Sequence, residues 1–233
     1  MRAFAGLCRP VGEALPPRAV LFDLDGTLAD TLPDLSHALS QAMTEHNIAP
    51  IQATVLRPVV SRGARAMAAH ACGDQVDPST LEQVVARFLA LYGADVARHT
   101  QLFDGMQALL DELQRRAIPW GVVTNKRRAY SEPLMNALDP RGHAACIVSG
   151  DSTANAKPHP QPLLHACKLM GSAPRHCVYV GDAENDVLAA RRAGMRSVVA
   201  LYGYIAPQDN PHGWRANATI DAPHELLVWL DSC

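Results

Sequence analysis

The sequence predicts an α/β fold in which a doubly wound parallel sheet carries helices on both faces and an α-helical cap interrupts the core. Two observations lead to this prediction. Short apolar runs alternate with helical patterns over the second half of the chain, as in βαβ units. A long stretch with helical spacing separates the first strand from this alternation. We therefore expect a core of residues 18–31 and 101–233 and an inserted helical cap of residues 32–100.

The first strand of the core is expected at 19–22, an apolar run that is followed at once by an aspartate. A run without polar alternation is typical of a strand buried on both faces of a sheet. The cap follows, because apolar residues recur there at helical spacing and Pro33 suits a first helical turn. These residues are Leu32, Leu35, Leu39 and Met43, and further on Leu81, Val84, Val85, Phe88, Leu91 and Tyr92.

Beyond Gly105 the remaining core elements alternate. We expect helices at 106–113, 131–137, 162–170 and 186–193, and strands at 120–123, 145–148, 177–180 and 197–201. Crossover connections between parallel strands place the helices on the faces of the sheet. The carboxyl ends of the strands then meet at one edge, where ligands bind in open α/β sheets.

The composition of the 233-residue chain is typical of a folded globular protein, with 48% hydrophobic and 19% charged residues. A net charge of −2 gives no basic field that would hold nucleic acid or an anionic membrane surface. Apolar runs are only a few residues long, whereas a transmembrane helix needs about 20 residues. We therefore expect neither nucleic acid nor a membrane as a partner.

The six cysteines are scattered without a C-x-x-C pair, which favours reduced thiols in a cytoplasmic protein. Residues 1–17 are expected to form a flexible leader, because glycines and prolines interrupt any apolar run that a signal peptide would need. The sequence leaves the oligomeric state open between a monomer and a homodimer.

Asp23 and Asp25 end the first strand, in the string Asp-Leu-Asp-Gly-Thr-Leu. In an extended chain, side chains two residues apart project to the same side, so both carboxylates are aimed into one site. Gly26 permits the sharp turn that follows. A buried strand rarely ends in two carboxylates without a cation, because an unpaired buried charge is costly. The alternative interpretation is an Asp-Gly turn with two solvated acids.

Three further polar segments end or precede later elements. They contain Thr124 and Asn125 after the strand at 120–123, Lys157 ahead of a helix, and Asp182 and Asp186 after the strand at 177–180. Taken singly, each has an ordinary structural explanation as a strand end, a surface lysine or an acidic helix N-terminus. A doubly wound sheet, however, would bring all of them to one edge beside the first pair of aspartates.

These residue types indicate phosphoryl chemistry with a divalent cation. Carboxylates suit Mg²⁺, which is bound through few carboxylates together with phosphate oxygens. An ionised aspartate can attack phosphorus and form an aspartyl-phosphate. A lysine supplies a point charge for phosphate oxygens, and a threonine hydroxyl adds a donor for the charge that develops in the reaction.

In this order, the four segments resemble the four motifs of the haloacid dehalogenase (HAD) superfamily, over about Ala19 to Leu201. The resemblance implies a Rossmann-like sheet of strand order 5-4-1-2-3 and a helical cap inserted after the first motif. It also implies a HAD-type phosphatase, a phosphoric monoester hydrolase that requires Mg²⁺ and acts on a small-molecule phosphate ester.

Residue by residue, the resemblance implies that Asp23 is the nucleophile. Asp25 would be the general acid/base that protonates the leaving alkoxide. The transferring phosphoryl group would be bound by Thr124, Asn125 and Lys157.

The resemblance also implies a set of metal ligands. Asp182 would ligate Mg²⁺ together with Asp23 and the backbone carbonyl of Asp25. Asp186 would contact these ligands from the outer shell.

Within the superfamily, the chain resembles the phosphoglycolate phosphatase group. Two segments, 61–67 and 202–211, resemble more narrowly the phosphatases that act on N-acetylmuramic acid 6-phosphate in peptidoglycan recycling. The implied substrate is therefore N-acetylmuramic acid 6-phosphate, with phosphoglycolate as the alternative. Both esters carry a carboxylate, and we expect Arg62 and Arg65 of the cap to bind it. A solvated helix start is the other interpretation of these two arginines.

Three other functions use related arrangements. A sugar-phosphate mutase would re-bind a phosphorylated intermediate under its cap; the sequence leaves this function open, and phosphate release without a bisphosphate product would exclude it. A dehalogenase normally lacks an acid two residues after its nucleophile, so Asp25 argues against one. A receiver-type module carries its phosphoacceptor on a later strand and has no cap, so Asp23 argues against that function.

Overall fold

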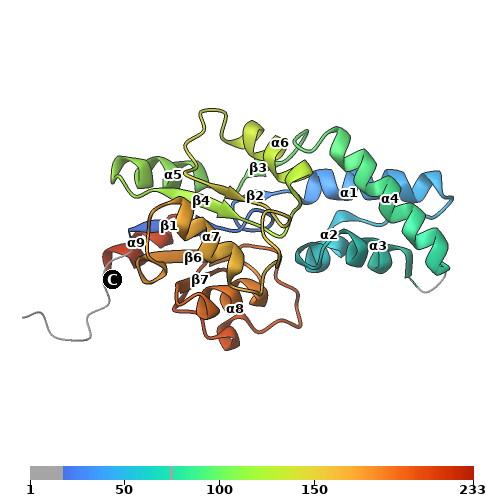
Figure 1. Cartoon of the computed structure of the whole chain (residues 1–233). Coiled ribbons are helices and arrows are strands. Elements are labelled where there is room, and N and C mark those ends of the chain that lie inside the picture. The colour runs from blue at the N-terminus through green and yellow to red at the C-terminus, as the bar shows by residue number, and fades with distance from the viewer. Residues whose placement is uncertain (1–17, 74–75) are drawn as a thin grey trace, which may run out of the picture.

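The computed structural model describes residues 18–73 and 76–233, and its centre is a six-stranded sheet of order β5-β4-β1-β6-β7-β8 (Figure 1). All neighbouring strands pair in parallel. The strands are β1 (Ala19–Phe22), β4 (Trp120–Val123), β5 (Ile147–Val148), β6 (Cys177–Gly181), β7 (Arg196–Ala200) and β8 (Ala218–Ile220).

The predicted strand order is confirmed. The five predicted strands are β1, β4, β5, β6 and β7, and in the sheet they follow one another as 5-4-1-2-3 in chain order. The structure adds β8 at the β7 edge, which the sequence analysis missed because its three residues form no apolar run. β5 begins at Ile147 rather than at 145, although the N–H of Ala145 still donates to the carbonyl of Trp120 at 2.7 Å.

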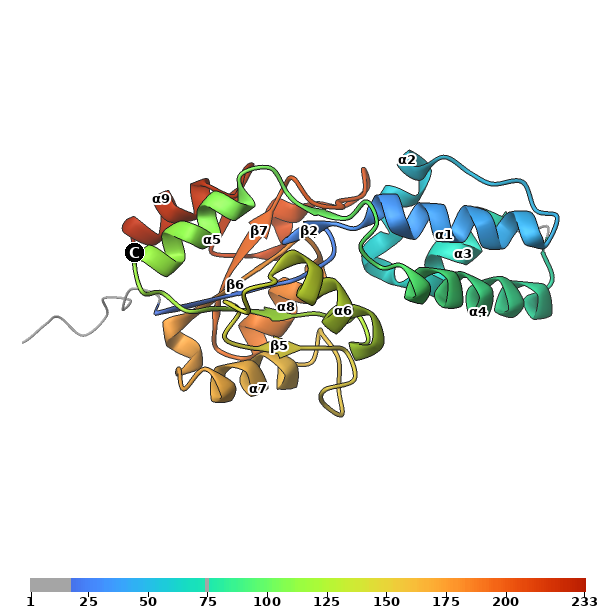
Figure 2. The same cartoon turned by 90° about the horizontal axis from the view of Figure 1, so that it is seen from above.

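The sheet is buried on both faces by helices. Val20 and Phe22 of β1 enter one hydrophobic cluster, and Ala19 and Leu21 enter the other. α5 (Met106–Arg115) and α9 (Glu225–Asp231) cover the first face, together with residues of α6 (Arg128–Leu138). α7 (Gln161–Leu169) and α8 (Glu184–Arg192) cover the second face (Figure 2). This two-sided burial explains why the central strands are continuous apolar runs.

The cap forms a separate group of helices beside the sheet (Figures 1 and 2). It contains α1 (Leu32–Glu45), α2 (Ala53–Leu56), the 3₁₀ helix η1 (Arg57–Arg62), α3 (Ala64–Cys72) and α4 (Pro78–Ala94). α1 and α4 pack against each other through apolar residues at helical spacing, among them Leu39, Met43, Val84 and Phe88, all of which are fully buried. The helical pattern of this stretch is therefore its core-forming face.

Two chain segments connect the cap to the core, and they are tied together. β2 (Ala29–Asp30) pairs antiparallel with β3 (Gln101–Leu102), and these short strands were not predicted. The buried carboxylate of Asp34 accepts hydrogen bonds from the backbone N–H groups of His99 and Thr100 and from the Thr100 hydroxyl, at 2.7–3.0 Å. The start of α1 is thus fixed to the segment that returns to the core.

No helix within the described ranges is long and apolar enough to cross a membrane. Five cysteines of these ranges are free thiols: Cys72, Cys146, Cys167, Cys177 and Cys233. Cys8 and the expected leader of residues 1–17 lie outside the described residues.

Replacing Asp34 should destabilise the protein through this connection. Asp34→Ala leaves three donors of His99 and Thr100 without their acceptor, and we expect the free energy of unfolding to fall by about 2–4 kcal/mol. Urea denaturation followed by circular dichroism measures the change. Asp95→Ala, at an exposed carboxylate just after α4, is the matched control and should shift the same quantity by no more than about 0.5 kcal/mol. Equal losses in both variants would contradict the assignment.

Candidate active site

Side chains from the carboxyl ends of two central strands meet at one edge of the sheet. Asp23 follows β1, and Asp182 follows β6, the strand that pairs with β1. Asp186 lies in the first turn of α8, and Lys157 precedes α7. One carboxylate oxygen from each of the three aspartates lies within 4.8 Å of the other two, and all three residues are buried. The structure thus brings the predicted core residues together.

The Lys157 ammonium is the cation of this cluster. Nζ lies 2.9 Å from Oδ1 of Asp23 and 2.8 Å from Oδ1 of Asp186, and it donates to the Tyr179 hydroxyl at 2.7 Å. Burial works against the charged form, but the carboxylates of Asp186 and Asp23 outweigh it and hold the pKa of Lys157 above its ordinary value. All three donors of the ammonium are therefore engaged within the protein.

The carboxylates themselves are short of positive charge. Burial, reinforced by the charges of Asp186 and Asp25 and opposed by Lys157, raises the pKa of Asp23 to about 7. Burial also raises the pKa of Asp182 to about 8, with the charges of Asp23 and Asp186 acting in the same direction. Three carboxylates around one ammonium repel one another, which is the arrangement that an additional cation would stabilise.

Hydrogen bonds from neighbouring backbone and side-chain donors fix each carboxylate in place. The donors are the N–H of Leu24 to Asp23 at 2.7 Å, the N–H of Tyr204 and the hydroxyl of Thr27 to Asp182 at 2.8 and 3.0 Å, and the N–H of Ala183 to Asp186 at 3.0 Å. Hydrogen bonds to a charged acceptor are stronger than neutral ones, so these contacts restrict the aspartate rotamers.

The glycines of the two acidic motifs make room for this packing. Gly26 has a φ of +83°, and a Cβ there would collide with the carboxylate of Asp182. A Cβ at Gly181 would collide with Asp186. The glycines of the two acidic motifs are therefore required by the close approach of the backbone to the carboxylates.

Thr124 and Asn125 occupy the end of β4, on the other side of β1. Thr124 is buried, and its hydroxyl accepts from the N–H of Lys126 at 3.1 Å. The Asn125 side chain exchanges two hydrogen bonds with the backbone of Lys157, at 2.9 and 3.0 Å. Asn125 thereby fixes the backbone segment from which the Lys157 side chain reaches the aspartates.

Asp25 has different partners from Asp23. Its Oδ1 accepts from the Thr31 hydroxyl at 2.6 Å and from Nζ of Lys126 at 2.7 Å. The Lys126 side chain is 8% exposed, and its Nζ lies 4.7 Å from the ring centroid of Tyr92, a residue of the cap helix α4. Burial opposes the charge of Lys126, but Asp25 and Tyr92 hold its pKa above the ordinary value. Lys126 was not among the predicted site residues, although it directly follows Thr124 and Asn125.

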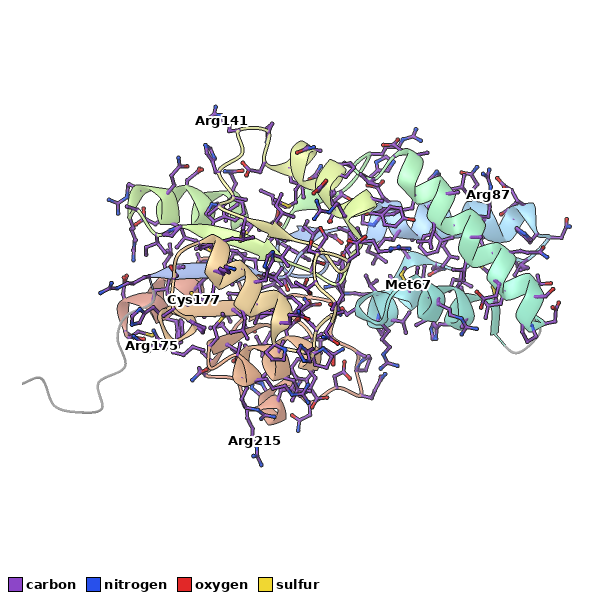
Figure 3. All side chains as sticks on the ribbon, viewed as in Figure 1. Met67, Arg87, Arg141, Arg175, Cys177 and Arg215 are labelled. Carbon is purple, nitrogen blue, oxygen red and sulfur yellow. The ribbon has the colours of Figure 1, made fainter. Side chains whose placement is uncertain are left out.

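A cavity of about 270 Å³ lies between these core residues and the cap. Core residues Asp23, Asp25, Thr124, Lys126, Tyr130 and Lys157 line one side, and Leu35, Val60, Ser61, Met67, Leu89 and Tyr92 line the cap side. Figure 3 labels Met67 on α3, where the cap meets the core. The cavity is polar at the sheet edge and largely apolar and aromatic toward the cap.

The two cap arginines lie elsewhere. Neither Arg62 nor Arg65 is among the residues that line this cavity; both are exposed, and Arg65 forms a 2.8 Å ion pair with Glu82 of α4. The same segment does reach the site through Ser61, whose hydroxyl donates to Oδ2 of Asp182 at 3.4 Å. The structure therefore joins this turn to the carboxylates through a hydroxyl and not through the arginines.

Comparison with known proteins gives a consistent result. The profile of the family described as haloacid dehalogenase-like hydrolase matches residues 20–200. A phosphoglycolate phosphatase of Xanthomonas campestris is 43% identical over 210 residues, which are 90% of this chain and 95% of that protein. An N-acetylmuramic acid 6-phosphate phosphatase of Pseudomonas putida is 40% identical over 215 residues, 92% and 96% of the two chains. The crystal structure of a predicted phosphoglycolate phosphatase from Haemophilus somnus superposes with a TM-score of 0.82 at 25% identity, covering 91% and 97% of the two chains.

The raised pKa values predict how stability depends on pH when no metal is bound. In the unfolded chain Asp23 and Asp182 have pKa values near 3.8, against about 7 and about 8 in the folded chain. Folding therefore favours their protonated forms, and this stabilisation is lost as the pH rises through 7 and 8. In a chelator, we expect Tm to fall between about pH 5.5 and about pH 8.5.

Scanning calorimetry in matched buffers measures this change. The double variant Asp23→Asn/Asp182→Asn lacks both titrating carboxyls, so its Tm should fall less over the same pH range. A Tm that rises with pH in the wild-type protein, or an equal decrease in both proteins, would contradict the charge distribution described above.

Proposed function

This chain belongs to the haloacid dehalogenase-like hydrolase family and is a phosphatase of that family, and we propose that it is Mg²⁺-dependent and acts through an aspartyl-phosphate on Asp23. The observation that carries the proposal is the group of three buried carboxylates around Lys157, which lacks the positive charge to balance it. The proposed substrate is a small phosphate ester that carries a carboxylate.

The donor set fits a hard divalent cation. Asp23 and Asp182 would hold Mg²⁺ together with the backbone carbonyl of Asp25, since oxygen ligands of this kind suit that ion. Asp186, which forms a 2.8 Å ion pair with Lys157 and accepts from the N–H of Ala183, would contact these ligands from outside the coordination sphere. When bound, the cation supplies positive charge to the phosphate oxygens and to the carboxylates.

Asp23 has one oxygen free for attack. Its Oδ1 accepts from Leu24 and Lys157, whereas within the described residues no hydrogen bond engages Oδ2. Oδ2 would attack phosphorus, forming a P–O bond as the bond to the ester oxygen breaks, and Asp25 would donate its proton to that leaving oxygen. In the second half, Asp25 takes a proton from the water that attacks phosphorus, which releases inorganic phosphate and restores Asp23.

The phosphoryl group needs donors on its other side. Lys157 provides a buried positive charge, and Thr124 a buried hydroxyl at the end of β4. Both line the cavity beside Asp23 and are held by the contacts of Asn125 and Lys126 described above. Preorganised donors of this kind stabilise the charge that develops on the transferring group.

N-acetylmuramic acid 6-phosphate is the substrate that we propose. The cavity volume of about 270 Å³ approaches the roughly 300 Å³ at which pockets begin to hold drug-sized ligands, and this exceeds the needs of a two-carbon acid. The cap side of the cavity is largely apolar, and Tyr92 of the cap lies beside Tyr130 of the core, with 5.7 Å between their ring centroids. Apolar and aromatic surfaces of this kind suit the faces of a sugar ring. Phosphoglycolate is the second candidate, because the relative at 43% identity bears the name of that activity.

A phosphate-release assay over both esters tests the class of substrate. We expect turnover of at least one of them, with inorganic phosphate and no bisphosphate as the product. Hydrolysis confined to esters without a carboxylate would contradict the substrate class, and a bisphosphate product would favour a mutase.

Removing the nucleophile should abolish turnover and leave the fold intact. Asp23→Asn replaces a carboxylate with an amide of similar size that is a poor nucleophile, and we expect phosphate release to fall by at least about 10³-fold. Circular dichroism and Tm, measured in chelator, serve as the control for folding. Retention of more than a few per cent of wild-type activity would overturn the role of Asp23.

Chelation tests the metal. EDTA should remove activity and Mg²⁺ should restore it, while Ca²⁺ restores little, because its larger coordination sphere loosens the in-line geometry. Atomic emission analysis of the same sample gives the residual metal content. Full activity of a protein shown to be free of metal would contradict the proposal.

A further inference from the structure

Two polar groups of the cavity are not used by the mechanism above, and they lie side by side. Lys126 extends from the loop after β4, and Tyr92 lies on the cap helix α4. Both line the cavity, and the lysine Nζ lies 4.7 Å from the centroid of the tyrosine ring. Core and cap thus each contribute one polar group at the same point.

Lys126 has hydrogen-bonding capacity to spare. Its ammonium carries three donors, and within the described residues Asp25 Oδ1 is the one acceptor that it reaches, at 2.7 Å. The side chain of Tyr92 covers another side of the ammonium, with its ring centroid 4.7 Å from Nζ, and its presence favours the charged form of the lysine. Even if Tyr92 takes a second donor, the third has no acceptor within the described residues. Unlike Lys157, this buried ammonium therefore has a donor left for an acceptor from outside the protein.

The hydroxyl of Tyr92 also lacks a hydrogen-bond acceptor. The residue is 1% exposed, and its hydroxyl is one of two buried side-chain polar groups in the described part of the chain without a hydrogen-bond partner of good geometry. The neighbouring ammonium of Lys126 has only donors, so it offers no acceptor for the hydroxyl proton. Leaving such a group unpaired is unfavourable by about 1–3 kcal/mol. Because Tyr92 is also one of the residues that line the cavity, a ligand bound there is a candidate partner for this hydroxyl.

We propose that the Lys126 ammonium and the Tyr92 hydroxyl form the subsite for the carboxylate of the substrate. The inference rests on the proposed function, which supplies a carboxylate-bearing phosphate ester. A carboxylate has two oxygens and accepts several hydrogen bonds, so one group can take the spare donor of Lys126 and the hydroxyl of Tyr92 together. Arg127, whose side chain is exposed and which also lines the cavity, adds positive charge nearby.

The position of this subsite relative to the reacting atoms supports the assignment. Lys126 lies one hydrogen bond away from Asp25, the residue proposed to protonate the ester oxygen. A group bound by Lys126 therefore belongs to the leaving alcohol and not to the phosphoryl group, which Lys157 and Thr124 would bind. Because Tyr92 comes from the cap, the subsite is complete only when the cap and the core are together.

Matched pairs of substrates isolate the carboxylate. N-acetylglucosamine 6-phosphate is N-acetylmuramic acid 6-phosphate without its lactyl arm, and 2-hydroxyethyl phosphate is phosphoglycolate with a hydroxymethyl in place of the carboxylate. The pair whose acidic member the wild-type protein hydrolyses faster is used for kcat/KM measurements. Failure to hydrolyse either acid would overturn the proposed substrate class, which is a different result from the outcomes below.

Tyr92→Phe is the main variant, because it removes only the hydroxyl and keeps the ring over Lys126. We expect kcat/KM for the acidic substrate to fall by about 10- to 100-fold, the scale of a lost hydrogen bond to a charged group. For the carboxylate-free partner it should fall by less than about threefold. Tyr130→Phe makes the same chemical change at a half-buried tyrosine of the same cavity. It should reduce the ratio of kcat/KM for the acidic substrate to kcat/KM for its partner less than Tyr92→Phe does.

Lys126→Gln is the second variant and removes the charge while keeping a donor for Asp25. It should lower kcat/KM for both substrates, with the larger loss on the acidic one. Arg65→Ala tests the competing assignment from the sequence. The proposal would be overturned if Tyr92→Phe and Lys126→Gln lowered kcat/KM equally for both substrates. It would also be overturned if Arg65→Ala were the one variant to lower kcat/KM selectively for the acidic substrate.

Discussion

The buried charges of Asp23, Asp182, Asp186 and Lys157 govern the arrangement of the whole site. Three carboxylates against one ammonium leave two negative charges when all groups are ionised. Mutual repulsion and burial raise the pKa values of Asp23 and Asp182, and every remaining donor of Lys157 is already used. A divalent cation would compensate this charge, and the same cation would attract the phosphate on which the nucleophile acts.

The scaffold separates the reaction from the selection of the substrate. Reacting groups lie on ends of the central strands, where Gly26, Gly181 and close backbone donors hold them rigidly. The cap supplies the apolar wall of the cavity and two polar contacts, Ser61 and Tyr92. Arg57 of the cap donates to the carbonyls of Tyr202 and Gly203 at 2.8 Å, which fixes the cap against the loop that follows β7. Selection of the leaving group therefore depends on how the cap is seated.

Much of the core could be predicted because its determinants are local. The runs 19–22 and 120–123 have the predicted bounds, since strands buried on both faces need uninterrupted apolar residues. The strand order was predicted from the resemblance to a family. The polar segments were predicted to lie together because the carboxyl ends of parallel strands share one edge of the sheet. The short edge elements β2, β3 and β8 carried no comparable pattern, because so few residues are buried in them.

Contacts between the cap and the core were beyond the reach of local patterns. Tyr92 fits a helical repeat as an ordinary packing residue, and its unpaired hydroxyl becomes visible only beside Lys126. Arg65 carries the charge that the sequence analysis sought, but its partner is Glu82, a neighbour across the cap. A lysine is usually exposed, so nothing in the chain marked Lys126 as buried.

Calorimetric titration of the metal-free protein with Mg²⁺ near neutral pH tests the charge imbalance most directly. With pKa values of about 7 and about 8, Asp23 and Asp182 are partly protonated without metal, so binding should release protons. We expect one Mg²⁺ site per chain and a binding enthalpy that depends on the ionisation enthalpy of the buffer. In Asp182→Asn, we expect both the binding and its buffer dependence to be lost. Absence of Mg²⁺ binding, or binding that releases no protons and survives Asp182→Asn, would contradict it.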